Sequence, residues 1–185
     1  MHANHCAKCL LHPPSINFCQ GIFHYESPIS RLITRFKFHD QFEIGFSLSF
    51  LLAGEIEKEY AGISQPEFLI PVPLHRERLR VRGFNQAFEI SKVISQQTSI
   101  PIGLDFVKKV RNTSAQTELD SASKRRRSQK NVFCCDKNRW PENVNHVAII
   151  DDVVTTMATV LSLASSLESH GVRHIDVWCL ARATL

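Results

Sequence analysis

The stretch VAIIDDVVTTMAT, at residues 147–159, contains the features that decide the fold of this chain. Its apolar first part, residues 147–150, is typical of a strand covered on both faces, as in a parallel sheet. Asp151 and Asp152 follow at the carboxyl end of that strand, where ligands of open α/β sheets bind. Residues 155–159 are then predicted to open a helix whose free backbone N–H groups could hold an anion. The stretch therefore predicts a strand, a loop suited to a sugar phosphate, and a helix.

The residues after this loop support the helix. Four apolar residues fall at the i, i+3, i+4 and i+7 spacing of one helix face, and Gly171 follows as a stop signal: Val160, Leu163, Ala164 and Leu167. The apolar run at residues 175–180 predicts a second strand. The whole unit therefore reads as a βαβ crossover, which is nearly always right-handed.

The order of residues in this unit resembles the PRPP-binding signature of type I phosphoribosyltransferases, PRPP being 5-phosphoribosyl 1-diphosphate. The resemblance implies that Asp151 and Asp152 bind the ribose hydroxyls, since carboxylates accept hydrogen bonds from vicinal hydroxyls. It also implies that the loop wraps the 5′-phosphate through a set of five residues: Thr155, Thr156, Met157, Ala158 and Thr159.

Met157 departs from this signature, in which glycine is usual at the equivalent position. Glycine lets the backbone approach a phosphate closely or adopt a positive φ. If φ at residue 157 is positive, Met is strained there; if it is negative, the loop is unstrained.

Three further blocks are similar to the ComF (competence protein F) and GntX group, in the same order along the chain. They are PVPLHR at residues 71–76, RGFNQA at residues 82–87 and RNTSAQTEL at residues 111–119. The resemblance implies that His75, Arg76 and Arg82 bind the diphosphate of PRPP. It also implies catalytic roles for Arg111 and Gln116, where cationic and polar groups would stabilise the departing diphosphate.

The sequence predicts an α/β fold, a type I phosphoribosyltransferase-like parallel sheet flanked by helices. We expect a short irregular N-terminal arm at residues 1–25, a remnant of a zinc ribbon, and a phosphoribosyltransferase-like domain at residues 26–185. Within that domain we expect two helices between residues 28 and 60, a strand at residues 68–72 and a helix at residues 84–96. Residues 112–130 read as a long polar loop, which in compact domains is commonly a lid or mobile element.

The N-terminal arm contains the pair Cys6 and Cys9, spaced as in zinc sites. A tetrahedral zinc site needs two more ligands. ComF-like proteins have a four-cysteine zinc ribbon, of which this chain matches only the second half. Three alternatives stay open: His2, His5 or Cys19 completes a Zn²⁺ site, the pair holds no metal, or the chain starts at an internal methionine.

The positive charge of the chain is local. Ten of its 22 basic residues but only three of its 18 acidic residues lie at residues 108–139, so the remainder is slightly acidic. A second basic cluster alternates through residues 76–82, and its guanidinium groups would share one side if the segment is extended. Such clusters could neutralise a diphosphate or a DNA backbone, or be solvated loops.

The resemblance implies a PRPP-binding phosphoribosyltransferase-like protein with a role in DNA uptake during natural transformation, with Mg²⁺ accompanying PRPP. Such a protein could transfer the pentosyl group to an acceptor. The alternative is a non-catalytic component of the uptake machinery that binds single-stranded DNA or competence proteins and retains the phosphoribosyl pocket. A third interpretation treats the acidic pair and threonines as ordinary turn and capping residues. Since the chain contains neither a membrane-length apolar run nor a signal-peptide core, we expect a cytoplasmic protein.

Overall fold

The computed structural model describes residues 16–39, 41–111, 132–136 and 138–183. Four parallel strands form its main sheet, in the order β1-β6-β5-β2. The bounds of these strands are β1 Phe18–His24, β2 Phe68–Pro71, β5 His146–Val154 and β6 His174–Arg182. A smaller antiparallel pair consists of β3 Val107–Lys109 and β4 Phe133–Cys135.

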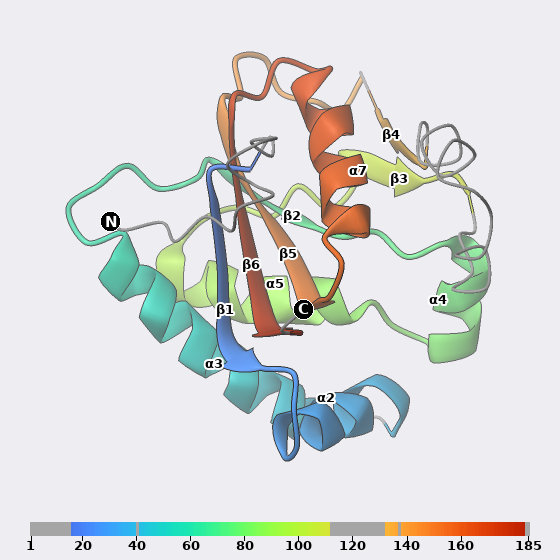
Figure 1. Ribbon diagram of the computed structural model, residues 1–185. Coiled ribbons are helices and arrows are strands. Elements are labelled where there is room, and N and C mark those ends of the chain that lie inside the picture. Colours follow the sequence, from blue (N-terminus) through green and yellow to red (C-terminus); the bar gives the residue numbers. More distant parts are fainter. Residues whose placement is uncertain (1–15, 40, 112–131, 137, 184–185) are drawn as a thin grey trace.

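Helices cover both faces of the main sheet (Figure 1). Alternate residues of β5 point to opposite faces, so Val147 and Ile149 pack with α7 whereas Ala148 and Ile150 pack with α2, α3 and α5. The bounds of these helices are α2 Ile29–Phe38, α3 Phe42–Glu59, α5 Gln86–Thr98 and α7 Ala158–Glu168. The α/β fold with a parallel sheet flanked by helices, as predicted from the sequence, is confirmed.

The predicted elements after residue 26 form close to their expected positions. The two helices expected between residues 28 and 60 are α2 and α3, and the strand at residues 68–72 is β2. The apolar stripe on α7 is fully buried, and Gly171 follows that helix with a φ of +93°. No helix in the described part of the chain has the length and apolar character to span a membrane.

The N-terminal boundary requires a correction. Residues 18–24, expected to belong to an irregular arm, form the edge strand β1, which pairs with β6 from Phe18↔Asp176 to His24↔Arg182. The physical reason is that without β1 the backbone of β6 would have an unpaired edge along its buried length. The α/β domain therefore already includes residue 18, while Cys6 and Cys9 lie outside the described residues.

The arginine-rich segment also differs from the extended alternative. Residues Arg76–Arg82 form a short helix, α4, which ends at Gly83 with a φ of +79°. In a helix, side chains four residues apart share a face, so Arg76 lies above Arg80 and Arg78 above Arg82. The guanidinium groups are therefore divided between two faces of α4.

Candidate functional site

The acidic pair lies at the carboxyl edge of the main sheet, where β2 stops and β5 continues. The last pair between these strands is Pro71↔Ile150, and the backbone N–H of Val72 donates to the carbonyl of Ile150 at 2.9 Å. Asp151 follows, still paired with Cys179 of β6 on its other side, and the pairing resumes after Asp152 at Val153↔Ala181. The strand was expected to end at residue 150, but it extends to Val154 because the buried residues of β6 continue alongside it.

The two carboxylates face opposite sides of the sheet. Asp151 shares the alternation of Val147 and Ile149, on the side of α7, whereas Asp152 shares that of Ala148 and Ile150. Their backbone geometry is linked, because Asp151 Oδ1 accepts from the N–H of Asp152 at 2.9 Å. The pair therefore extends across the edge of the sheet.

Asp151 is more easily protonated than an ordinary aspartic acid. Burial and, to a smaller extent, the neighbouring carboxylate of Asp152 raise the pKa of Asp151 to about 7. The ammonium groups of Lys37 and Lys109 oppose this rise. Near neutral pH this carboxyl group can therefore exist in either protonation state.

Asp152 has a different partner, contributed by α2. The Nζ atom of Lys37 lies 2.9 Å from Asp152 Oδ2, and the side chains of both are largely buried, with 17% and 11% of their surface exposed. Lys37 was not predicted from the sequence as a site residue. Its spacing from the buried Ile33 on α2 was the available signal, because residues four apart on a helix share a face.

The loop from β5 to α7 has the left-handed backbone that the glycine of the signature would favour. Met157 immediately precedes α7 with a φ of +61°. Its side chain is partly buried and packs against the core beneath α7. Thr155, Thr156 and Thr159 are exposed around this turn, and Ala158 begins the helix. The five predicted phosphate-loop residues are therefore contiguous at the N-terminus of an 11-residue helix.

The PVPLHR and RGFNQA blocks lead away from the neighbouring strand β2. The Asn85 amide group donates to the carbonyl of Val72 at 3.1 Å and its Oδ1 accepts from the N–H of Ala87, so this residue both anchors and caps α5. Arg82 donates to Gln86 Oε1 at 3.0 Å, and its guanidinium lies 5.1 Å from the ring centroid of Phe38. The RGFNQA block is therefore held against both β2 and the end of α2.

The remaining predicted diphosphate residues lie at the start of α4. His75 precedes the helix and Arg76 is its exposed first residue. His75 Nδ1 is buried without a hydrogen bond, and the nearest carboxylate oxygen of Glu77 is 3.6 Å away. His75 therefore has an unsatisfied buried nitrogen next to the carboxyl end of β2.

The predicted catalytic residues and metal ligands are described only in part. Arg111 is exposed after β3, and Gln116 lies outside the described residues. Cys19, one of the alternative zinc ligands, lies on β1, where burial raises the pKa of its thiol and disfavours the thiolate form that binds metals.

Lys109, on β3, is a further residue of this site that was not predicted from the sequence. Burial lowers the pKa of Lys109, the charge of Arg78 acts in the same direction, and Asp151 opposes both. Cations from two elements, Lys37 of α2 and Lys109 of β3, therefore act on Asp151, and Arg78 of α4 acts on Lys109 in turn.

Comparisons with known proteins give relatives that match nearly the whole of this chain. The chain is 41% identical to competence protein F of Haemophilus influenzae over 186 residues, covering 98% of this chain and 80% of that protein. It is 35% identical to the DNA utilization protein YhgH of Escherichia coli K12 over 179 residues, covering 96% of this chain and 77% of that protein.

Other comparisons contribute less. No protein-family model matches the chain. A solved structure described as a glutamic acid mutant, from an analysis of an invariant aspartic acid in HPRTs, aligns with a TM-score of 0.46 and 15% identity. That alignment covers 76% of this chain and 78% of the other. The sequence relatives, at up to 41% identity over nearly its whole length, show that the chain belongs to the competence protein F (ComF) family.

Proposed function

We propose that this protein binds PRPP at the carboxyl edge of its sheet and serves DNA uptake, as the names of its relatives suggest. The observation that carries the proposal is the loop from β5 to α7. It places an acidic pair, suited to vicinal hydroxyls, directly before a left-handed turn and a helix N-terminus, suited to a phosphate.

The ligand would extend from this loop toward β2. Its 5′-phosphate would lie on residues 155–159, its ribose hydroxyls on Asp151 and Asp152, and its diphosphate toward His75, Arg76 and Arg82. Mg²⁺ favours phosphate oxygens and retains waters, so the diphosphate would supply much of its coordination. Arg111 and Gln116 would act on the departing diphosphate if the protein transfers the phosphoribosyl group.

Isothermal titration with PRPP and Mg²⁺ tests this proposal. We expect saturable binding by the wild-type protein and its loss in the double variant Asp151→Asn, Asp152→Asn, because neutral amides replace both carboxylate acceptors. A circular-dichroism spectrum and a melting temperature establish that the variant is folded. Unchanged affinity in the folded double variant would refute the assigned pocket.

A second candidate function is binding of single-stranded DNA without catalysis. The exposed Arg76 and Arg80 on α4 favour it, together with the basic surplus at residues 108–139. Phosphate contacts release counterions, so affinity for an oligonucleotide would fall steeply with salt, and Arg76→Ala with Arg80→Ala would reduce the slope by roughly one per lost contact. An unchanged salt slope in this double variant would exclude α4 as the DNA-binding surface.

A further inference from the structure

The buried ion pair between Lys37 and Asp152 lies within the proposed ribose site. Asp152 is 8% exposed, and its carboxylate is the group that would accept hydrogen bonds from a ribose hydroxyl. The ammonium of Lys37 already occupies one of its oxygens at 2.9 Å. The other oxygen, Oδ1, accepts from the backbone N–H of Val153 at 2.6 Å, so both oxygens of Asp152 already have a partner. A ribose that binds Asp152 must therefore share an oxygen with one of these partners or displace Lys37.

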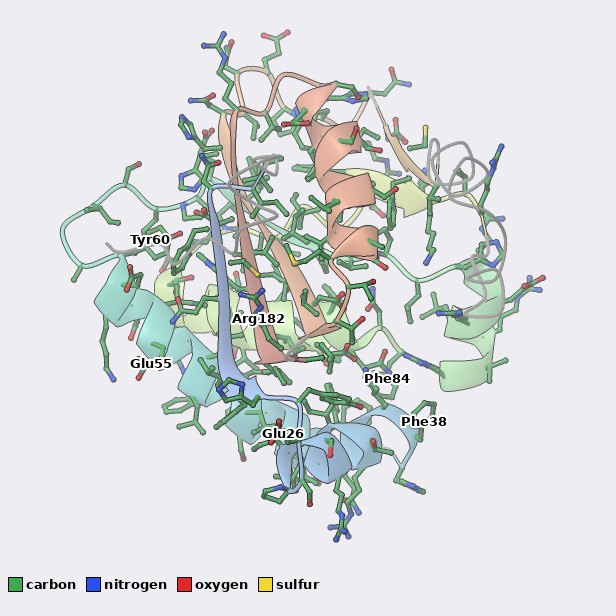
Figure 2. All side chains as sticks on the ribbon, viewed as in Figure 1. Glu26, Phe38, Glu55, Tyr60, Phe84 and Arg182 are labelled. Atoms are coloured by element: carbon green, nitrogen blue, oxygen red, sulfur yellow. The ribbon has the colours of Figure 1, made fainter. Side chains whose placement is uncertain are left out.

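The end of α2 is fixed at this position by aromatic packing. Phe36 is buried, with its ring centroid 6.5 Å from that of Phe42 and 5.7 Å from that of Phe84. Figure 2 labels Phe38, the last residue of α2, and Phe84, which precedes α5, near the carboxyl ends of the strands. Because the neighbouring Phe36 is buried among these rings, the backbone position of Lys37 is set independently of any ligand.

Consecutive residues of α2 connect two parts of the proposed site. Lys37 pairs with Asp152, the predicted ribose residue, while the ring of Phe38 packs against the guanidinium of Arg82, a predicted diphosphate residue. On PRPP the diphosphate is attached to C1, next to the hydroxyl-bearing C2. If the Lys37 ammonium is released from Asp152, it would therefore lie nearer to the diphosphate than to the 5′-phosphate.

We propose that Lys37 is a ligand-binding residue that neutralises Asp152 in the free protein and pairs with the C1 diphosphate when PRPP binds. This inference rests on the proposed function. In this proposal α2 contributes to ligand recognition. The Lys37 ammonium stabilises Asp152 in the empty site and contacts the ligand in the occupied site. A charge-assisted hydrogen bond of this kind contributes more than a neutral one.

Titrations with PRPP and with ribose 5-phosphate test the proposal, since only PRPP has the C1 diphosphate. In Lys37→Met we expect the affinity for PRPP to fall roughly tenfold to a hundredfold, the fold-change that the loss of one charge-assisted contact produces. The affinity for ribose 5-phosphate should change by a much smaller factor. Lys37→Arg, which keeps the charge, should recover part of the PRPP affinity.

Lys58→Met is the matched control, because Lys58 also pairs with a carboxylate but lies exposed on α3, away from the site. It should leave both affinities unchanged. Equal losses for the two ligands in Lys37→Met would indicate a structural role and overturn the proposal, as would unchanged PRPP binding. If the wild-type protein binds no PRPP, the proposed function itself fails; if it binds and Lys37→Met binds equally, only the role of Lys37 fails.

Discussion

Met157 has a backbone conformation that residues other than glycine adopt only at a cost in free energy. At a φ of +61° its Cβ crowds the following carbonyl oxygen, and left-handed backbone costs roughly 1–2 kcal/mol for an ordinary residue. Its partly buried side chain recovers some of that cost by packing beneath α7. Met157, which stands where the signature has glycine, therefore gains contacts with the core but lacks the conformational freedom that glycine has at a positive φ.

Comparing Met157→Gly with Met157→Ala separates these two contributions. Both variants lose the packing of the Met157 side chain, but only the glycine variant also relieves the strain of the left-handed backbone. We expect the glycine variant to have a free energy of unfolding about 1 kcal/mol greater than the alanine variant, measured by urea denaturation. Equal stabilities would show that residue 157 is unstrained in solution.

Asp151 makes stability depend on pH, because its pKa is raised from the ordinary range to about 7. The folded protein then retains a proton that the unfolded chain has released. The stabilisation from this group is complete below the unfolded pKa and decreases as pH rises toward 7. Asp151→Asn removes this decrease, so we expect it to stabilise the protein more at pH 8 than at pH 5.

Urea denaturation at the two pH values measures the difference. Glu142→Gln, on an exposed part of the loop before β5, is the control that also replaces a carboxylate by an amide. If Asp151→Asn gives the same stability change at both pH values, then burial does not perturb Asp151 as described.

At the scale of elements, α2 and α3 meet through a glycine. A Cβ added at Gly45 would lie 2.4 Å from Cε2 of the buried Phe36, whereas one added at Gly54 of the same helix would meet no heavy atom within 4 Å. We expect Gly45→Ala to lower the free energy of unfolding by about 1–3 kcal/mol through overpacking. Gly54→Ala should raise it by up to about 1 kcal/mol through helix propensity, and urea denaturation of both variants checks the contrast.

Gly54→Ala is the matched control for the substitution itself. Because both positions lie within α3, helix propensity changes by a similar amount in the two variants. A stabilised Gly45→Ala protein would mean that Phe36 can move aside, and the fixed position proposed for the end of α2 would then be in doubt.

The sequence was sufficient to predict the central βαβ unit, because its periodicities are local to β5, α7 and β6. It was not sufficient for β1, since an edge strand is defined by the backbone of β6 far along the chain. Lys37 was missed for the same reason: its partner, Asp152, is distant in sequence and the pair depends on how α2 packs. The position of Asp151 and Asp152 after the apolar part of the strand could be read from the sequence, but their opposite orientations depend on the extension of the strand to Val154.

At the scale of the whole molecule, the two edges of the sheet contain different polar networks. Opposite the acidic pair, at the amino edge, the buried Asp176 accepts from the hydroxyl of Tyr60 and lies 2.6 Å from His146 Nε2. Tyr60 lies at the far end of α3 from Phe38 and Phe84 (Figure 2). Burial and the hydrogen bond to Asp176 raise the pKa of Tyr60, so its hydroxyl remains a donor.

We expect substitutions in the network around Asp176 to change the stability of the protein and to leave its affinity for PRPP nearly unchanged. Asp176→Asn and Tyr60→Phe should each lower the free energy of unfolding by about 1–3 kcal/mol, since each disrupts a buried hydrogen bond. Neither should change PRPP affinity by more than about twofold, because additivity holds between distant sites. Titration and denaturation of the same preparations test this, and a folded variant that loses PRPP binding would contradict it.

The pairing of β1 with β6 has a consequence for synthesis on the ribosome. The N–H of Ile175 donates to Asn17 across 158 residues of sequence, so β1 emerges long before its partner strand exists. Contacts of such long range slow folding, and an unpaired strand edge promotes aggregation while it waits. β1 therefore remains without its partner strand until translation has passed residue 182.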